Sequence, residues 1–120
     1  MARILAVDDS AAMRRIVGTT LQAAGHEVVQ ARDGREALEI ARGTTLDLVL
    51  TDVNMPNLDG IGLVRALRGM PAYARTPLIV LTTEAGAESK HRGREAGVTG
   101  WVVKPFNPER LVQAIAGVLG

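Results

Sequence analysis

The sequence predicts an α/β fold of the doubly wound type, in which a parallel β-sheet carries helices on both faces. Short runs of Val, Ile and Leu alternate along the chain with segments whose apolar residues recur every three or four positions. Hydrophobic residues make up 47% of the 120 residues but aromatic residues only 2%, so aliphatic side chains must build the core. Strands that are buried on both faces of a parallel sheet have this composition.

Five strands are expected, at about residues 3–7, 27–30, 46–51, 77–82 and 100–103. Each precedes a helical segment, and the 120 residues leave 24 for each of five strand–helix units. That length holds a strand and a crossover helix, with no room for a linker. We therefore expect residues 1–120 to form a single domain with no effector domain.

The first and last helices have the clearest predicted boundaries. Ser10 is expected to cap the first helix, and Gly25 to stand just past its end. Asn107, followed by proline at the first helical position, is expected to cap the last helix. The spacing predicts that these two helices bury the following side chains: Met13, Ile16, Val17, Thr20, Leu21 and Ala24 in the first, and Leu111, Ile115 and Val118 in the last.

The fourth helix, predicted over residues 86–96, is nearly all polar. Only Ala87 and Ala96 offer apolar anchors, and Gly93 costs about 1 kcal/mol relative to Ala in a helix interior. We therefore expect this helix to be weakly held.

Composition and charge argue against several classes of function. Without Cys there is no disulfide framework or thiolate metal site, and two His are too few for a histidine-rich zinc centre. The net charge of +1 lacks the basic excess that direct nucleic-acid binding usually requires. No apolar run approaches membrane-spanning length, so we expect a cytoplasmic protein without membrane insertion.

Candidate functional residues stand where the predicted strands end. Asp8 and Asp9 follow the first strand, Asp52 the third and Lys104 the fifth, while Thr82 ends the fourth. An Asp pair before a helix is commonly no more than a favourable charge at the helix N-terminus. Three carboxylates at one edge of a sheet would repel each other, however, unless a cation lies among them. Oxygen ligands of this kind favour Mg²⁺, which often binds phosphate oxygens as well.

Phosphoryl transfer is the chemistry that such a group of residues favours. A carboxylate can form an acyl phosphate, while Mg²⁺, a lysine and a hydroxyl neutralise charge on the transferred group. Asp52, Lys104 and Thr82 could fill the roles of nucleophile, cation and hydroxyl.

Four segments carry a resemblance to a known family. The segments VDDS at 7–10, TDVNMPNLDG at 51–60, LTTE at 81–84 and WVVKPF at 101–106 resemble the receiver domains of two-component response regulators. The resemblance covers the whole chain and is strongest to the single-domain chemotaxis regulators. It implies a flavodoxin-like sheet with strand order 2-1-3-4-5.

The resemblance also implies a role for each residue at the strand ends. Asp52 looks like the phosphoacceptor, and Lys104 like the partner of the phosphoryl group. Mg²⁺ would be bound by Asp52, directly by Asp9, largely through water by Asp8, and through the backbone carbonyl of Asn54.

Switching and reversal are implied by the same resemblance. Thr82 would move its hydroxyl to the phosphoryl group, and this movement would be coupled to the aromatic residue of the fifth strand. That residue is Trp101, which stands where the family usually has Tyr or Phe. Because Trp is bulkier and can only donate a hydrogen bond, we expect its inward-turned rotamer to be harder to accommodate. Asn54 and Glu84 would help to set the rate at which the aspartyl phosphate hydrolyses. The Lys104–Pro105 bond would be cis.

The implied partners are a sensor histidine kinase and a downstream protein bound by the fourth helix, fifth strand and fifth helix. The protein would be a monomer that phosphorylation could cause to dimerise. We expect it to control chemotaxis or motility, although Ser10 and Val53 stand where well-known chemotaxis regulators have Phe and Trp. It would be a regulatory protein that catalyses only its own phosphorylation and dephosphorylation.

Two alternative functions remain. A small Mg²⁺-dependent phosphotransferase or phosphatase would act on a diffusible substrate, but no substrate-specificity domain or lid is visible in the sequence. A protein that only binds partners and no longer turns over phosphate would be expected to lack one or more of these site residues. Repeated turnover of a free phosphoester would indicate the enzyme, and a stoichiometric acyl phosphate the switch.

Overall fold

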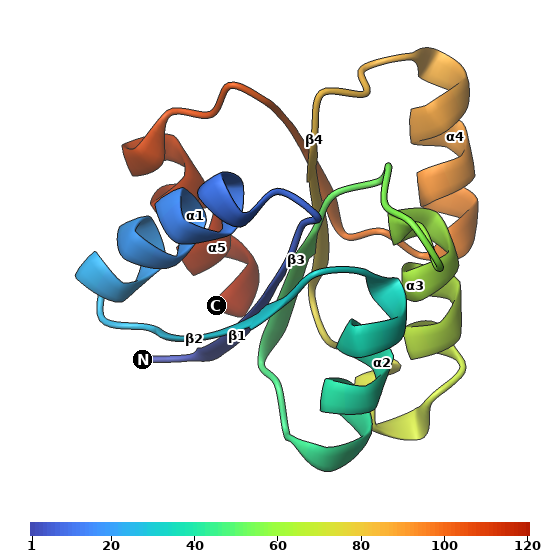
Figure 1. Ribbon diagram of the computed structural model, residues 1–120, viewed down its shortest axis with the longest axis horizontal. Coiled ribbons are helices and arrows are strands. Elements are labelled where there is room, and N and C mark those ends of the chain that lie inside the picture. The colour runs from blue at the N-terminus through green and yellow to red at the C-terminus, as the bar shows by residue number, and fades with distance from the viewer.

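The computed structural model describes residues 1–120 as five parallel strands that alternate with five α-helices (Figure 1). The strands are β1 Arg3–Val7, β2 Glu27–Ala31, β3 Leu48–Thr51, β4 Leu78–Thr82 and β5 Gly100–Val103. The helices are α1 Ala11–Ala23, α2 Gly34–Gly43, α3 Gly60–Arg68, α4 Ala87–Ala96 and α5 Pro108–Leu119, with a short 3₁₀ turn at Pro71–Tyr73. The strand order is β2-β1-β3-β4-β5, which confirms the predicted doubly wound fold.

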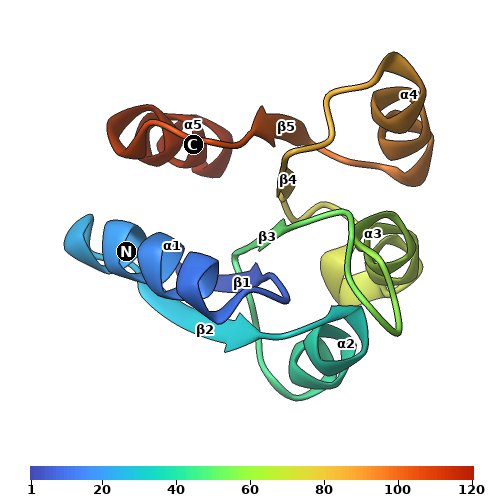
Figure 2. The same cartoon turned by 45° about the horizontal axis from the view of Figure 1, so that its top comes forward.

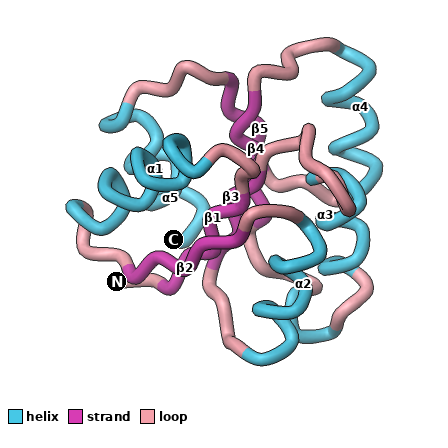
Figure 3. The backbone as a smooth tube through the Cα atoms, viewed as in Figure 1, coloured by secondary structure: helices cyan, strands magenta, loops and turns pink.

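The sheet lies between two layers of helices. Helices α1 and α5 lie on one side, and α2, α3 and α4 on the other (Figure 2). Alternate residues of each strand face opposite layers: Leu5 and Val7 belong to the core under α2 and α3, and Ile4 and Ala6 to the core under α1 and α5. The strands run through the centre of the molecule (Figure 3) and all pair in parallel, so their carboxyl ends share one edge.

Three strand boundaries differ from those predicted. Strand β2 runs one residue further, to Ala31, while β3 and β4 begin later, at Leu48 and Leu78. Asp47 lies just before β3, and its carboxylate accepts a hydrogen bond from the backbone N–H of Arg3, 2.7 Å away. Apolar character alone cannot place such a boundary, since Leu46 is buried although it lies outside the strand.

Two helices expose side chains that were predicted to be buried. In α1 the buried positions are Val17, Gly18 and Leu21, whereas Ile16 is 51% exposed. In α5 Leu111 and Ile115 are buried as predicted, but Val118 is 36% exposed. The apolar stripe that faces the sheet is therefore narrower than the spacing of apolar residues predicts.

Helix α4 differs from the other helices at its N-terminus. Side chains cap the first turn of the other four by accepting a backbone N–H: Ser10, Asp33, Asp59 and Asn107. Helix α4 instead begins after Gly86, which has no side chain to offer. Ala87 is exposed, so its prediction as an anchor is wrong, and the buried residues are Gly93 and Ala96.

None of these helices is both long enough and apolar enough to cross a membrane.

Candidate functional site

Three carboxylates meet at the edge of the sheet where the strands end. Asp8 and Asp9 follow β1 and Asp52 follows β3, and carboxylate oxygens of all three lie within 4.8 Å of one another. They converge because β1 and β3 are neighbours in parallel register, with Val7 opposite Thr51. Asp8 is buried, Asp52 half-buried and Asp9 exposed, so the cluster opens to solvent on one side.

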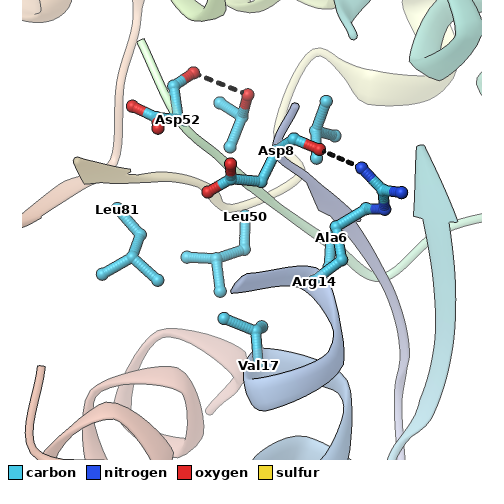
Figure 4. Close-up of a pocket in the computed structure, with 9 residues that line it drawn as sticks. Ala6, Asp8, Arg14, Val17, Leu50, Asp52 and Leu81 are labelled. Carbon is cyan, nitrogen blue, oxygen red and sulfur yellow. Dashed lines mark hydrogen bonds between the residues drawn. The ribbon is translucent and has the colours of Figure 1, made fainter. Parts of the chain in front are cut away.

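Backbone donors and a helix residue hold these acids in place. Asp8 accepts the N–H of Ser10 at 2.9 Å, and Asp52 accepts the N–H of Val53 at 2.6 Å. Figure 4 shows Asp8 and Asp52 side by side, and Arg14 of α1 donating to the backbone carbonyl of Asp8 at 2.6 Å. Arg14 is not among the residues that the sequence predicts for this site, and its only sequence signal is its place in the first turns of α1.

Lys104 is the cation that contacts the cluster. Its Nζ donates to Asp8 Oδ2 at 2.6 Å and to Asp52 Oδ2 at 2.9 Å. Burial would lower the pKa of Lys104, but the hydrogen bonds and charges of Asp8 and Asp52 outweigh burial and raise it above its usual value. Lys104 therefore remains charged at neutral pH and bridges the ends of β1, β3 and β5.

The charge of this cluster fits a divalent cation. One lysine faces three carboxylates, and Asp9 has no hydrogen-bond partner in the protein. Like charges this close destabilise a site unless a further cation balances them, and a set of carboxylate oxygens suits Mg²⁺. Asp8, Asp9 and Asp52 could hold that ion.

The loop after β3 carries Asn54 close to the cluster. Asn54 is exposed, two residues beyond Asp52. The loop returns to the site at Gly60, whose N–H donates to Val53 O at 2.8 Å. A Cβ at Gly60 would overlap the backbone carbonyl of Asp52, so only glycine allows α3 to begin so close to that residue. Gly60 therefore determines where the loop after β3 ends and α3 begins.

Thr82, Glu84 and Trp101 form a second group beside the acids. Thr82 is fully buried, and its hydroxyl oxygen accepts the backbone N–H of Glu84 at 3.2 Å. Trp101 Nε1 donates to Glu84 O at 2.8 Å. The Lys104–Pro105 bond, just beyond β5, is cis.

Trp101 is half-buried and lies against the core under α3. A Cβ at Gly93 would come within 2.8 Å of the indole ring. In the observed rotamer, the bulk of Trp101 is thus matched by the missing side chain at Gly93. The expectation about its inward-turned rotamer stays a prediction. The glycine that weakens α4 as a helix also provides the room for this ring.

The sequence of this chain matches one protein family over most of its length. The family model for the response regulator receiver domain matches residues 4–116. The chain belongs to this family. The chain is 46% identical over 114 residues to a gliding motility regulatory protein of Myxococcus xanthus. The match covers 94% of this chain but only 15% of that longer protein.

Chemotaxis proteins are similar over their whole length. A CheY homolog of Campylobacter jejuni is 38% identical over 120 residues, covering 98% of this receiver domain and 92% of the homolog. The crystal structure of CheY4 from Vibrio cholerae matches with a TM-score of 0.94 and 49% identity, covering 98% of both chains. The receiver domain is therefore CheY-like and belongs to two-component signalling.

Proposed function

We propose that this receiver domain is a phosphorylation-activated switch that takes a phosphoryl group from a sensor histidine kinase on Asp52. The observation that supports this most strongly is Lys104, which bridges Asp8 and Asp52 within a cluster of three carboxylates. Receiver domains as a class take phosphoryl groups from histidine kinases and bind Mg²⁺ at an acidic pocket. The proposal assigns those general properties to particular residues of this chain.

Asp52 supplies the nucleophile in this proposal. An oxygen of its carboxylate forms a bond to phosphorus as the bond from phosphorus to the kinase histidine nitrogen breaks, and that nitrogen keeps the electron pair. Asp8, Asp9, Asp52 and the backbone carbonyl of Asn54 would hold Mg²⁺, which when bound would supply positive charge that stabilises the phosphoryl oxygens. Lys104 gives up its bond to Asp52 and donates to the transferred group instead.

Phosphorylation then reaches the rest of the domain through Thr82. Its hydroxyl turns to the phosphoryl group and gives up the N–H of Glu84, which it accepts in the structure. The carbonyl of Glu84 accepts a hydrogen bond from Trp101, so the movement of this loop affects β5 and α4. These elements, together with α5, form the proposed surface for a downstream protein.

Hydrolysis of the aspartyl phosphate returns the switch to its resting state. Asn54 and Glu84 are the polar side chains proposed to orient the attacking water. The protein acts on its own Asp52 and is a regulator rather than an enzyme with a diffusible substrate. Its similarity to CheY chemotaxis proteins supports a role in the control of chemotaxis or motility. The proposal also places the protein in the cytoplasm as a monomer that phosphorylation could cause to dimerise.

The test is the intact mass of the protein after incubation with acetyl phosphate, with and without Mg²⁺. We expect one phosphoryl adduct that requires Mg²⁺ and that is absent in Asp52→Asn. If acetyl phosphate gives none, a sensor kinase is tried as donor. Absence of the adduct with both donors would contradict the proposal and favour a phosphorylation-independent interaction module. Repeated turnover of a free phosphoester would favour an enzyme instead.

A further inference from the structure

The loop before α4 is tied to the helix by a side-chain contact, although this contact satisfies no backbone N–H of the first turn. Gly86 offers no side-chain acceptor to the first turn of α4. Instead, Ser89 in that turn donates its hydroxyl to Glu84 Oε1 at 2.8 Å. Both side chains are half-buried, so this bond is partly shielded from competing water.

Glu84 is held at three points by three different elements. Its N–H donates to Thr82 of β4, its carbonyl accepts from Trp101 of β5, and its carboxylate accepts from Ser89 of α4. Oε2 has no partner within the protein. The carboxylate is therefore anchored through one oxygen and leaves the other free to accept a hydrogen bond from water.

We propose that Ser89 is a positioning residue for hydrolysis of the aspartyl phosphate, acting through Glu84. This inference rests on the proposed function of Asp52 and Glu84. A glutamate side chain has several rotatable bonds, and a group that orients a water molecule is effective only when it is itself held in place. The bond from Ser89 supplies that restraint.

The step that Ser89 assists is ordinary hydrolysis. The water oxygen forms a bond to phosphorus, and the bond from phosphorus to the Asp52 carboxylate oxygen breaks. Asp52 leaves with the electron pair, and the water loses one proton to solvent as inorganic phosphate forms. Glu84 accepts a hydrogen bond from the attacking water, and Ser89 touches neither the water nor the phosphate.

The experiment follows the loss of the phosphoryl adduct by intact mass after the donor is removed, in the presence of Mg²⁺. We expect Ser89→Ala to lengthen the lifetime of the adduct about three- to tenfold, which corresponds to the net contribution of one typical intramolecular hydrogen bond. Ser89→Thr keeps the hydroxyl and should restore a lifetime near that of wild type. Glu88→Ala is the matched control, because Glu88 is an exposed acid in the same turn with no hydrogen bond.

The decisive comparison is made in a Glu84→Ala background, where Ser89→Ala should have no further effect on the lifetime. An equal effect in that background would mean that Ser89 acts only on the structure of α4 and would overturn the inference. A lifetime in Ser89→Ala that is unchanged or shorter would also overturn it, with Asp52 still accepting phosphate. A wild-type protein that forms no adduct with any donor would overturn the proposed function itself, and this inference with it.

Discussion

Lys104 carries a positive charge that two neighbouring carboxylates hold in place. The hydrogen bonds to Asp8 and Asp52 raise the pKa of Lys104, so the folded protein binds this proton more tightly than the unfolded chain does. The contribution to stability is fully present below the ordinary pKa of 10.5 and is lost as the pH rises through the higher pKa of the folded state. Stability should therefore fall in strongly alkaline solution.

Lys104→Met allows this contribution to be measured. Burial also raises the pKa of Tyr73 above its ordinary 10.0, so wild type loses stability above that pH for two reasons. The variant retains Tyr73, and the difference in unfolding free energy between the two proteins isolates Lys104. We expect that difference, measured by urea denaturation without Mg²⁺, to shrink from about pH 10 upward. A difference that stays constant with pH would contradict the assignment.

The sequence predicts part of this site but not all of it. The convergence of Asp8, Asp52 and Lys104 follows from the rule that parallel strands end at one edge, once the strands are recognised. The contact of Arg14 with the carbonyl of Asp8 does not follow, because it depends on the angle at which α1 leaves β1. The fit of Trp101 against Gly93 depends in the same way on the packing of α4.

Helix α4 shows why a polar helix is hard to orient from its sequence. Its two Ala residues are the natural candidates for burial, but Ala87 is exposed and Gly93 is buried. Small residues produce only a weak hydrophobic periodicity along a helix. The face of α4 that packs on the sheet is therefore determined by the residue it contacts, here the indole ring of Trp101. The end of α4 is better defined, because Gly97 follows it with a φ of 106°, a conformation that favours glycine.

The substitution Gly93→Ala tests the contact between α4 and the ring of Trp101. Alanine favours a helix interior over glycine by about 1 kcal/mol, but its Cβ would meet the ring of Trp101. We expect the clash to prevail, so that the free energy of unfolding falls and the fluorescence of Trp101, the only tryptophan, changes. Gly117→Ala in α5 is the matched control: a Cβ added there would have no atom within 4 Å, and the substitution should stabilise the protein. Similar stabilisation by both variants would show that Trp101 moves aside freely.

The exchange of backbone amides should also single out α4. It lacks a side-chain cap and buries only Gly93 and Ala96, whereas α1 and α5 are capped and bury larger aliphatic side chains. We expect its amide hydrogens to exchange with deuterated solvent faster than those of α1 and α5 in the unphosphorylated protein. Exchange in α4 as slow as in those two helices would contradict the expectation that this helix is weakly held.

At the scale of the whole molecule, the apolar runs predict the number of strands and the alternation with helices. The runs alone do not determine the order of the strands, because all five are similarly aliphatic; that order comes from the resemblance to receiver domains. The observed order places β1 and β3 side by side, and this adjacency creates the acidic cluster. The topology thus turns two separated sequence motifs into one site whose charge affects the stability of the entire domain.

Mg²⁺ should therefore stabilise the folded domain, and Asp9 offers the sharpest test. Binding to the native state alone raises the free energy of unfolding by about 2.7 kcal/mol at a hundredfold excess over the dissociation constant. Asp9 is exposed and lacks a hydrogen-bond partner, so Asp9→Ala should remove repulsion and leave the metal-free protein as stable as wild type or slightly more so. The same variant should lose most of the Mg²⁺-dependent gain, measured by urea denaturation over a series of Mg²⁺ concentrations. Glu88→Ala, which removes an exposed acid of α4 outside the cluster, should keep the full gain. A gain in Asp9→Ala equal to that of wild type would show that the ion binds without this carboxylate.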